Sequence, residues 1–86
     1  MKNSDLEQLR KLVRSVLAQH GKLSVDANQI SDEADLYYAG LTSLSTVTIM
    51  LALEDYFDVE FSDSMLSRAT FQSVESLSIA IESLLD

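Results

Sequence analysis

The segment that decides the fold is the run of residues 35–57, which reads DLYYAGLTSLSTVTIMLALEDYF. From Ser43 to Phe57 this run is apolar on nearly every side of a helix, and its two acids come late. A helix of that kind is usually fully buried, which a domain of 86 residues cannot easily arrange. We therefore expect a helix over about 43–57 with one apolar stripe in the core and a second exposed to a partner. The expected core stripe is Val47, Met50, Leu53 and Phe57, and the second runs from Leu44 to Leu51.

The start of this helix carries a serine. Gly40 lies in the preceding loop, Thr42 has a hydroxyl suited to the N-cap position, and Ser43 would follow at the first helical position. A phosphate ester on Ser43 would lie beside unpaired backbone N–H groups, which favour an anion by about 0.3–1 kcal/mol. The same residues also suit a plain turn and cap in which Ser43 has no chemical role. The residue pattern by itself leaves both interpretations open.

Two further helices flank this segment. The first is expected over about 5–20, opened by the capping-box spacing of Ser4 and Glu7 and closed by Gly21 in the left-handed conformation. The last is expected over about 72–85, with Thr70 or Ser73 as its cap. The apolar face of the first helix is Leu6, Leu9, Leu12, Val13, Val16 and Leu17. The inward face of the last is Val74, Leu77, Ile81, Leu84 and Leu85.

The connections between these helices lack sustained periodicity. Residues 22–42 form a long first loop, with a short turn around residues 32–36. We expect a brief helical turn after residue 61, capped by Ser62. The alternating residues 57–61 could instead form a strand, but no second strand is expected that could pair with it. The fold class expected is all-α, a small helical bundle of three main helices plus one short helix, in a single domain over residues 1–86. The side chains expected to fasten the first loop are Leu23, Val25, Ile30 and Leu36.

The charge distribution excludes some partners. Residues 1–22 hold five basic and two acidic side chains (net +3), whereas residues 23–86 hold twelve acids and only Arg68 (net −11), so the chain carries −8. This balance argues against nucleic-acid binding and favours basic protein surfaces as partners. No apolar run is long enough to span a membrane, and the N-terminus lacks a leader pattern. We expect a monomer in the cytoplasm.

Residues suited to catalysis are scarce. The chain has no cysteine, and its single histidine, His20, falls at a helix end, where it would complement the helix dipole. No zinc-protease, phosphate-loop or dinucleotide motif is present, and the acids of residues 55–63 lack the spacing of a calcium loop. We expect no enzyme activity, no catalytic residue and no metal site.

The segment around Ser43 resembles the attachment motif of the acyl carrier protein family, the phosphopantetheine-dependent carriers. The likeness covers about residues 5–85 and rests on Asp35-Leu36, on Gly40-Leu41-Thr42-Ser43-Leu44, and on an apolar helix that ends in Glu54, Asp55 and Phe57. The pattern from Asp35 to Ser43 is similar to the subgroup that carries amino acids. One position departs from the family, because Thr42 stands where the family has an aspartate.

This resemblance implies a stand-alone acyl or aminoacyl carrier that shuttles a thioester-bound group between enzymes. A phosphopantetheinyl transferase would attach 4′-phosphopantetheine from coenzyme A to Ser43, and that group would supply the thiol that the chain lacks. Further partners would be an acyl- or aminoacyl-activating ligase and a downstream acyltransferase or synthase. The alternative is an unmodified, non-covalent interaction module with the same fold, which the change at Thr42 keeps open. The docking face implied by position in the motif is Thr42, Leu44, Val47, Leu51, Glu54 and Asp55.

Overall fold

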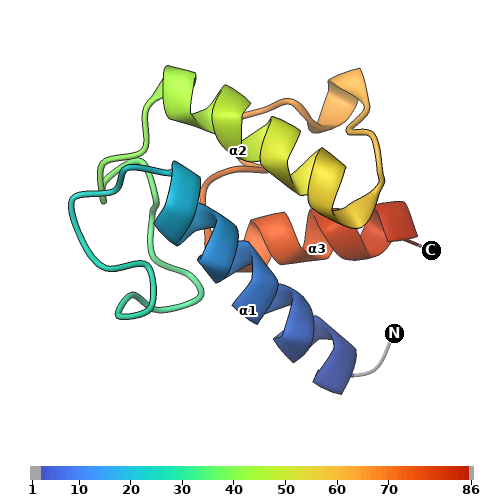
Figure 1. Ribbon diagram of the computed structural model, residues 1–86, viewed down its shortest axis with the longest axis horizontal. Helices are drawn as coiled ribbons and strands as arrows, with labels where there is room; N and C mark the ends of the chain where they lie inside the picture. The colour runs from blue at the N-terminus through green and yellow to red at the C-terminus, as the bar shows by residue number, and fades with distance from the viewer. Residues whose placement is uncertain (1–2, 86) are drawn as a thin grey trace.

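Over residues 3–85 the protein folds as a bundle of three α-helices with one short 3₁₀ turn (Figure 1). The computed structural model describes the backbone of residues 3–85 and the side chains of residues 6–85. No strand occurs in that range, so the expected all-α class is confirmed. The elements are α1 (Asn3–His20), α2 (Ser43–Phe57), η1 (Asp63–Met65) and α3 (Val74–Leu85). None of the helices described combines the length and the apolar character that a membrane crossing requires.

The core forms where α1 contacts both α2 and α3. Each helix contributes side chains at helical spacing. Phe61 and Phe71, from the connection between α2 and α3, complete the interior, and their rings stack at a centroid distance of 5.7 Å. Burial of each such side chain stabilises the fold by roughly 1.5–3 kcal/mol. The central buried residues are Leu9, Val13, Leu17, Leu36, Ile49, Leu53, Phe61, Phe71, Val74, Leu77 and Ile81.

The buried stripe of α2 differs from the one expected. Ser45, Ile49 and Leu53 face the core, whereas Val47 is 51% exposed. Met50 and Phe57 are only half buried. Because the helix was apolar on nearly every side, periodicity could not decide which stripe meets α1. The expectation that the second stripe, from Leu44 to Leu51, is exposed is confirmed.

The end of α1 also departs from expectation. Lys22, with φ of 53°, takes the left-handed conformation, and Gly21 does not. Gly21 is needed for a different reason, because a Cβ there would lie 2.7 Å from the Leu17 carbonyl oxygen, which accepts the Gly21 N–H. The helix begins two residues before the predicted start, and the side chain of Ser4, the predicted cap, lies outside the described residues. His20 lies in the last turn, as expected.

The start of α3 is capped by a reciprocal pair of serines. Ser73 Oγ accepts the Ser76 N–H, and Ser76 Oγ accepts the Ser73 N–H, each at 3.0 Å. Of the two candidate caps, Ser73 is therefore the one used, whereas Thr70 offers only its carbonyl to Ser76. Leu85 was expected to face inward but is exposed, whereas Leu84, on a different side of the same turn, is half buried against the core.

The long first loop is fastened by α1 through Arg14. Its guanidinium donates to the carbonyls of Ala27 (2.6 Å) and Ile30 (2.8 Å) and to Asp32 Oδ1 (2.6 Å). Arg10 lies beside it and donates to Glu75 Oε1 of α3 at 2.7 Å, a hydrogen bond that raises the pKa of Arg10. These contacts join α1, the loop and α3.

The apolar side chains predicted to fasten the loop give a mixed outcome. Leu36 is fully buried, and Leu23 and Ile30 are half buried against the core. Val25 is exposed, contrary to expectation. Ala27 is buried in its place, at one of the carbonyls that Arg14 holds.

Candidate functional site

Thr42 caps α2 and places Ser43 at its first position. The backbone of Thr42 is extended (φ −113°, ψ 168°), and its hydroxyl oxygen accepts the Ser45 N–H at 3.1 Å. Ser43 is exposed, and its hydroxyl has no hydrogen-bond partner among the residues described. The first turn of α2 carries no acid. The structure thus presents a free hydroxyl at the positive end of the helix.

The loop before Ser43 is held from both sides. Asp35 Oδ1 accepts the backbone N–H of Tyr37 at 2.9 Å, which stabilises the turn that follows. The N–H of Leu36 donates to the Gln72 carbonyl at 2.6 Å, beside the start of α3. The loop is therefore fixed to the last helix as well as to the core.

Gly40 permits a close approach within this loop. Its φ of 116° lies in a region that favours glycine, and a Cβ there would lie 2.9 Å from the backbone nitrogen of Ser24. Ser24 donates both its N–H (2.8 Å) and its hydroxyl (2.7 Å) to the Ala39 carbonyl. The two ends of the long loop thereby meet directly before Ser43.

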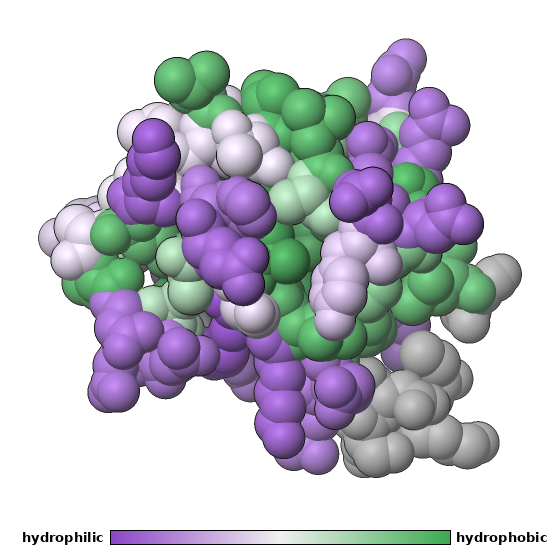
Figure 2. Space-filling view, viewed as in Figure 1, coloured by the Kyte–Doolittle hydropathy of each residue, from purple (hydrophilic) through white to green (hydrophobic). Residues whose placement is uncertain are grey.

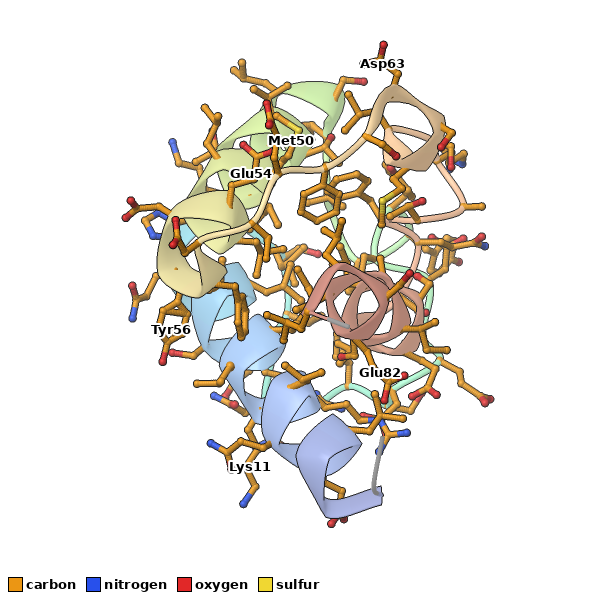
Figure 3. All side chains as sticks on the ribbon, turned by 90° about the vertical axis from the view of Figure 1, so that its right-hand side faces the viewer. Lys11, Met50, Glu54, Tyr56, Asp63 and Glu82 are labelled. Carbon is orange, nitrogen blue, oxygen red and sulfur yellow. The ribbon has the colours of Figure 1, made fainter. Side chains whose placement is uncertain are left out.

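An open groove of about 360 Å³ runs beside Ser43, between α2 and the connection from η1 to α3. Its volume falls within the range of small-molecule sites. Met50 and Phe71 give it an apolar lining, and Met50 lies on the side of α2 turned toward that connection (Figure 3). We call it the Ser43 groove; it is lined by Tyr37, Ser43, Thr46, Val47, Met50, Leu66, Ser67, Arg68 and Phe71.

Two lining residues form a stacked pair. The guanidinium carbon of Arg68 lies 4.0 Å from the centre of the Tyr37 ring, a cation–π contact typically worth ~0.5–1 kcal/mol at exposed sites. Burial raises the pKa of the Tyr37 phenol, Arg68 acts to lower it, and Asp35 raises it. Sequence reasoning did not select either residue for the site. The available signal was that Arg68 is the only base in residues 23–86.

The predicted docking face lies mostly on the solvent side of α2. Leu44 is 80% exposed and Leu51 56%, and Figure 2 shows apolar side chains along the edge where α2 lies. Thr42, Val47 and Asp55 are also exposed. Glu54 differs, because its carboxylate accepts the Phe61 N–H at 2.8 Å and so ties α2 to the following connection. Its role in docking remains a prediction.

The family described as "Phosphopantetheine attachment site" matches residues 7–81. The chain belongs to this family of carrier proteins. It is 42% identical over 74 residues to the aminoacyl carrier protein of Agrobacterium fabrum (strain C58 / ATCC 33970). The aligned region covers 86% of this chain and 89% of that protein. The carrier's fold and its covalent 4′-phosphopantetheine group follow from this membership.

Two solved structures extend the comparison. One is an engineered Bradyrhizobium japonicum glycine:[carrier protein] ligase complexed with carrier protein from Agrobacterium tumefaciens and AMP. A chain of that structure matches this carrier protein at 40% identity with a TM-score of 0.81. The match covers 85% of this chain and 97% of the matched chain. The other is the holo acyl carrier protein of Nitrosomonas europaea, at 29% identity and a TM-score of 0.80, over 91% and 96% of the two chains.

The residues of this carrier protein suit the prosthetic group. A phosphoester needs an exposed hydroxyl, which Ser43 provides without an internal hydrogen bond to break. The Ser43 groove adjoins this hydroxyl and has apolar and polar parts that an amide-containing arm can contact. When bound, the group supplies a thiol, and the carrier itself contains no cysteine.

Proposed function

We propose that Ser43 is the attachment residue and that the carrier bears an aminoacyl thioester. The observation that carries the first part is the position of the Ser43 hydroxyl, exposed at the first residue of α2 and on the rim of a groove. In the transfer step, Ser43 Oγ forms a bond to the phosphorus next to the pantetheine of coenzyme A. The pyrophosphate bond breaks, adenosine 3′,5′-bisphosphate leaves, and the hydroxyl proton passes to the transferase or solvent.

The aminoacyl cargo is supported by the relatives. The aminoacyl carrier protein at 42% identity and the ligase complex with a carrier at 40% identity both concern amino acids. The groove also favours a short cargo, because Phe71 in its lining is itself a buried core side chain, so the groove does not continue into an empty interior. A ligase that activates an amino acid with ATP would form the thioester, and a downstream acyltransferase would accept it.

In this function the chain presents the cargo and performs no catalysis. The described residues around Ser43 include no histidine, cysteine or carboxylate in the groove lining that could act as a general base. In this proposal the carrier docks, through the exposed face of α2, on enzymes that supply the chemistry. Leu44, Val47 and Leu51 form the apolar part of that face.

Intact mass spectrometry tests the attachment residue. After incubation with coenzyme A and a broad-specificity phosphopantetheinyl transferase, we expect the gain of one phosphopantetheine by the wild type and none by Ser43→Ala. Ser67→Ala is a matched control, because Ser67 lines the same groove and should leave loading unchanged. Loading of Ser43→Ala would overturn the assignment. A wild type that several transferases ignore would instead favour the unmodified interaction module.

The cargo is tested on the loaded protein. An amino acid:carrier protein ligase with ATP and single amino acids should add one aminoacyl group that hydroxylamine removes. Acyl-activating ligases with medium or long fatty acids serve as the comparison. Efficient loading by these ligases, with no aminoacylation, would overturn the aminoacyl assignment while leaving Ser43 in place.

A further inference from the structure

The Ser43 groove has a second wall that attachment at Ser43 does not use. Ser43 and Val47 come from α2, Arg68 comes from the connection between η1 and α3, and Tyr37 comes from the first loop. The connection that holds Arg68, which is distant in the sequence from Tyr37 and Ser43, therefore meets them around one groove. Its opposite wall carries the Arg68–Tyr37 stack.

Arg68 differs from the other arginines in its surroundings. Arg10 and Arg14 form ion pairs with carboxylates, whereas Arg68 forms none with the described residues. Its planar face is taken by the Tyr37 ring at 4.0 Å. A guanidinium stacked on a ring keeps the N–H groups at its edge available, and that edge suits phosphate oxygens.

The charge in the groove has one sign. None of the nine lining residues is a carboxylate, and Arg68 is the only charged side chain among them. The first turn of α2 adds no acid, and Thr42 is neutral. A phosphodiester on Ser43 would therefore meet a single positive charge within the same groove, with no neighbouring acid in the lining to oppose it.

We propose that Arg68, supported by Tyr37, is a positioning residue that binds the phosphodiester on Ser43 and holds the pantetheine arm along the groove. This inference rests on the proposed attachment at Ser43. The apolar side chains of Met50 and Phe71 provide the surface that the arm covers. The arm of this carrier is thereby restrained near α2 between docking events.

The test uses the loaded carrier with a ¹⁵N-labelled pantetheine arm, after mass spectrometry has shown loading of every variant. We expect Arg68→Gln to shift the ³¹P resonance of the phosphodiester and to lower the heteronuclear NOE of the arm amides. It should also remove the differences between loaded and unloaded protein at backbone amides 66–71. Arg68→Lys keeps the charge and should retain part of the ³¹P shift.

Matched variants separate positioning from effects on folding or net charge. Lys11→Gln removes one positive charge from an exposed position of α1 that points away from the core (Figure 3), and should leave the arm signals unchanged. Tyr37→Phe keeps the ring and should behave as wild type, whereas Tyr37→Ala should lower the arm NOE. Spectra of the unloaded variants report whether each one folds.

A loaded Arg68→Gln protein whose ³¹P shift and arm NOE match the wild type would overturn the proposal. A raised KM for the ligase in that same variant would then make Arg68 a contact for the partner enzyme. Failure of Ser43 to load at all is a separate result, seen in the mass spectrum, and would contradict the proposed function instead.

Discussion

The hydroxyl oxygen of Thr42 accepts a hydrogen bond from the backbone N–H of Ser45 at 3.1 Å, so a neutral side chain caps the helix that starts at Ser43. The family's aspartate at this position would make the same kind of bond and add a negative charge. The substitution thus preserves the helix start while leaving the first turn of α2 without an acid.

We expect Thr42→Ala to destabilise the fold by about 1 kcal/mol, because it removes the N-cap acceptor. Thr42→Ser and Thr42→Asp keep an acceptor and should stay close to the wild type. Urea denaturation followed by circular dichroism measures the difference. An alanine variant as stable as the serine variant would contradict the role of this cap.

Replacing Arg14 by methionine should cost about 2–3 kcal/mol, because three charge-assisted hydrogen bonds to the first loop are lost together. Amide hydrogen exchange over residues 22–34 should accelerate more than exchange in α3. Lys11→Met, on the exposed side of the same helix, provides the control. Equal exchange rates in the two variants would show that Arg14 does not fasten the loop.

Gly40→Ala should destabilise the protein by about 1–3 kcal/mol, because the new Cβ would lie 2.9 Å from the Ser24 nitrogen at an unfavourable φ. The displaced loop should also slow loading by the transferase, since it leads directly to Ser43. Tyr38→Ala, at an exposed position of the same loop, should change stability by less than about 0.5 kcal/mol. Thermal unfolding and a loading time course would show whether the two variants separate in this way.

Leu44→Ser should raise the KM of an amino acid:carrier protein ligase roughly tenfold, the equivalent of about 1.4 kcal/mol, while stability stays nearly constant. The reason is that Leu44 is 80% exposed on the proposed docking face and contributes little to the core. Ile79→Ser is the matched control, because Ile79 is an apolar side chain of α3 that is 48% exposed. Equal effects of the two substitutions on KM would count against docking through α2.

The Tyr37 phenol should titrate above its ordinary value near 10, mainly because of its burial, and Arg68→Gln should raise its pKa further. A raised folded-state pKa favours the protonated form in the folded protein. The contribution of the Tyr37 phenol to the free energy of unfolding is therefore complete below the ordinary pKa. It is lost as the pH rises through the folded-state pKa.

Ultraviolet absorbance of the phenolate measures this titration. Subtraction of a Tyr37→Phe titration removes the contribution of Tyr38 and Tyr56. A lower Tyr37 pKa in Arg68→Gln would contradict the stacked arrangement, since loss of a nearby cation should disfavour the phenolate.

The helices were largely predictable because their determinants are local. The bounds of α2 were predicted near Ser43 and Phe57, and the Thr42 cap and the turn after Ser62 were also predicted. Ser62 does not cap that turn with its side chain, because no backbone N–H of the turn donates to its hydroxyl; its carbonyl accepts the Met65 N–H at 2.9 Å. Gly21 illustrates the limit of that approach. A glycine is needed at position 21 because the Leu17 carbonyl lies too close for a Cβ. The left-handed conformation that was expected of Gly21 is adopted by Lys22.

The helical class, the position of Ser43 at the start of α2 and the excess of apolar surface on that helix could all be predicted from the chain alone, because they depend on neighbours within a few residues. The entry of Ile49, and not Val47, into the core and the meeting of Arg68 and Tyr37 beside Ser43 could not. Burial and charge pairing depend on which distant segments come together. The contacts of α1, and the path of the connection before α3, set that arrangement.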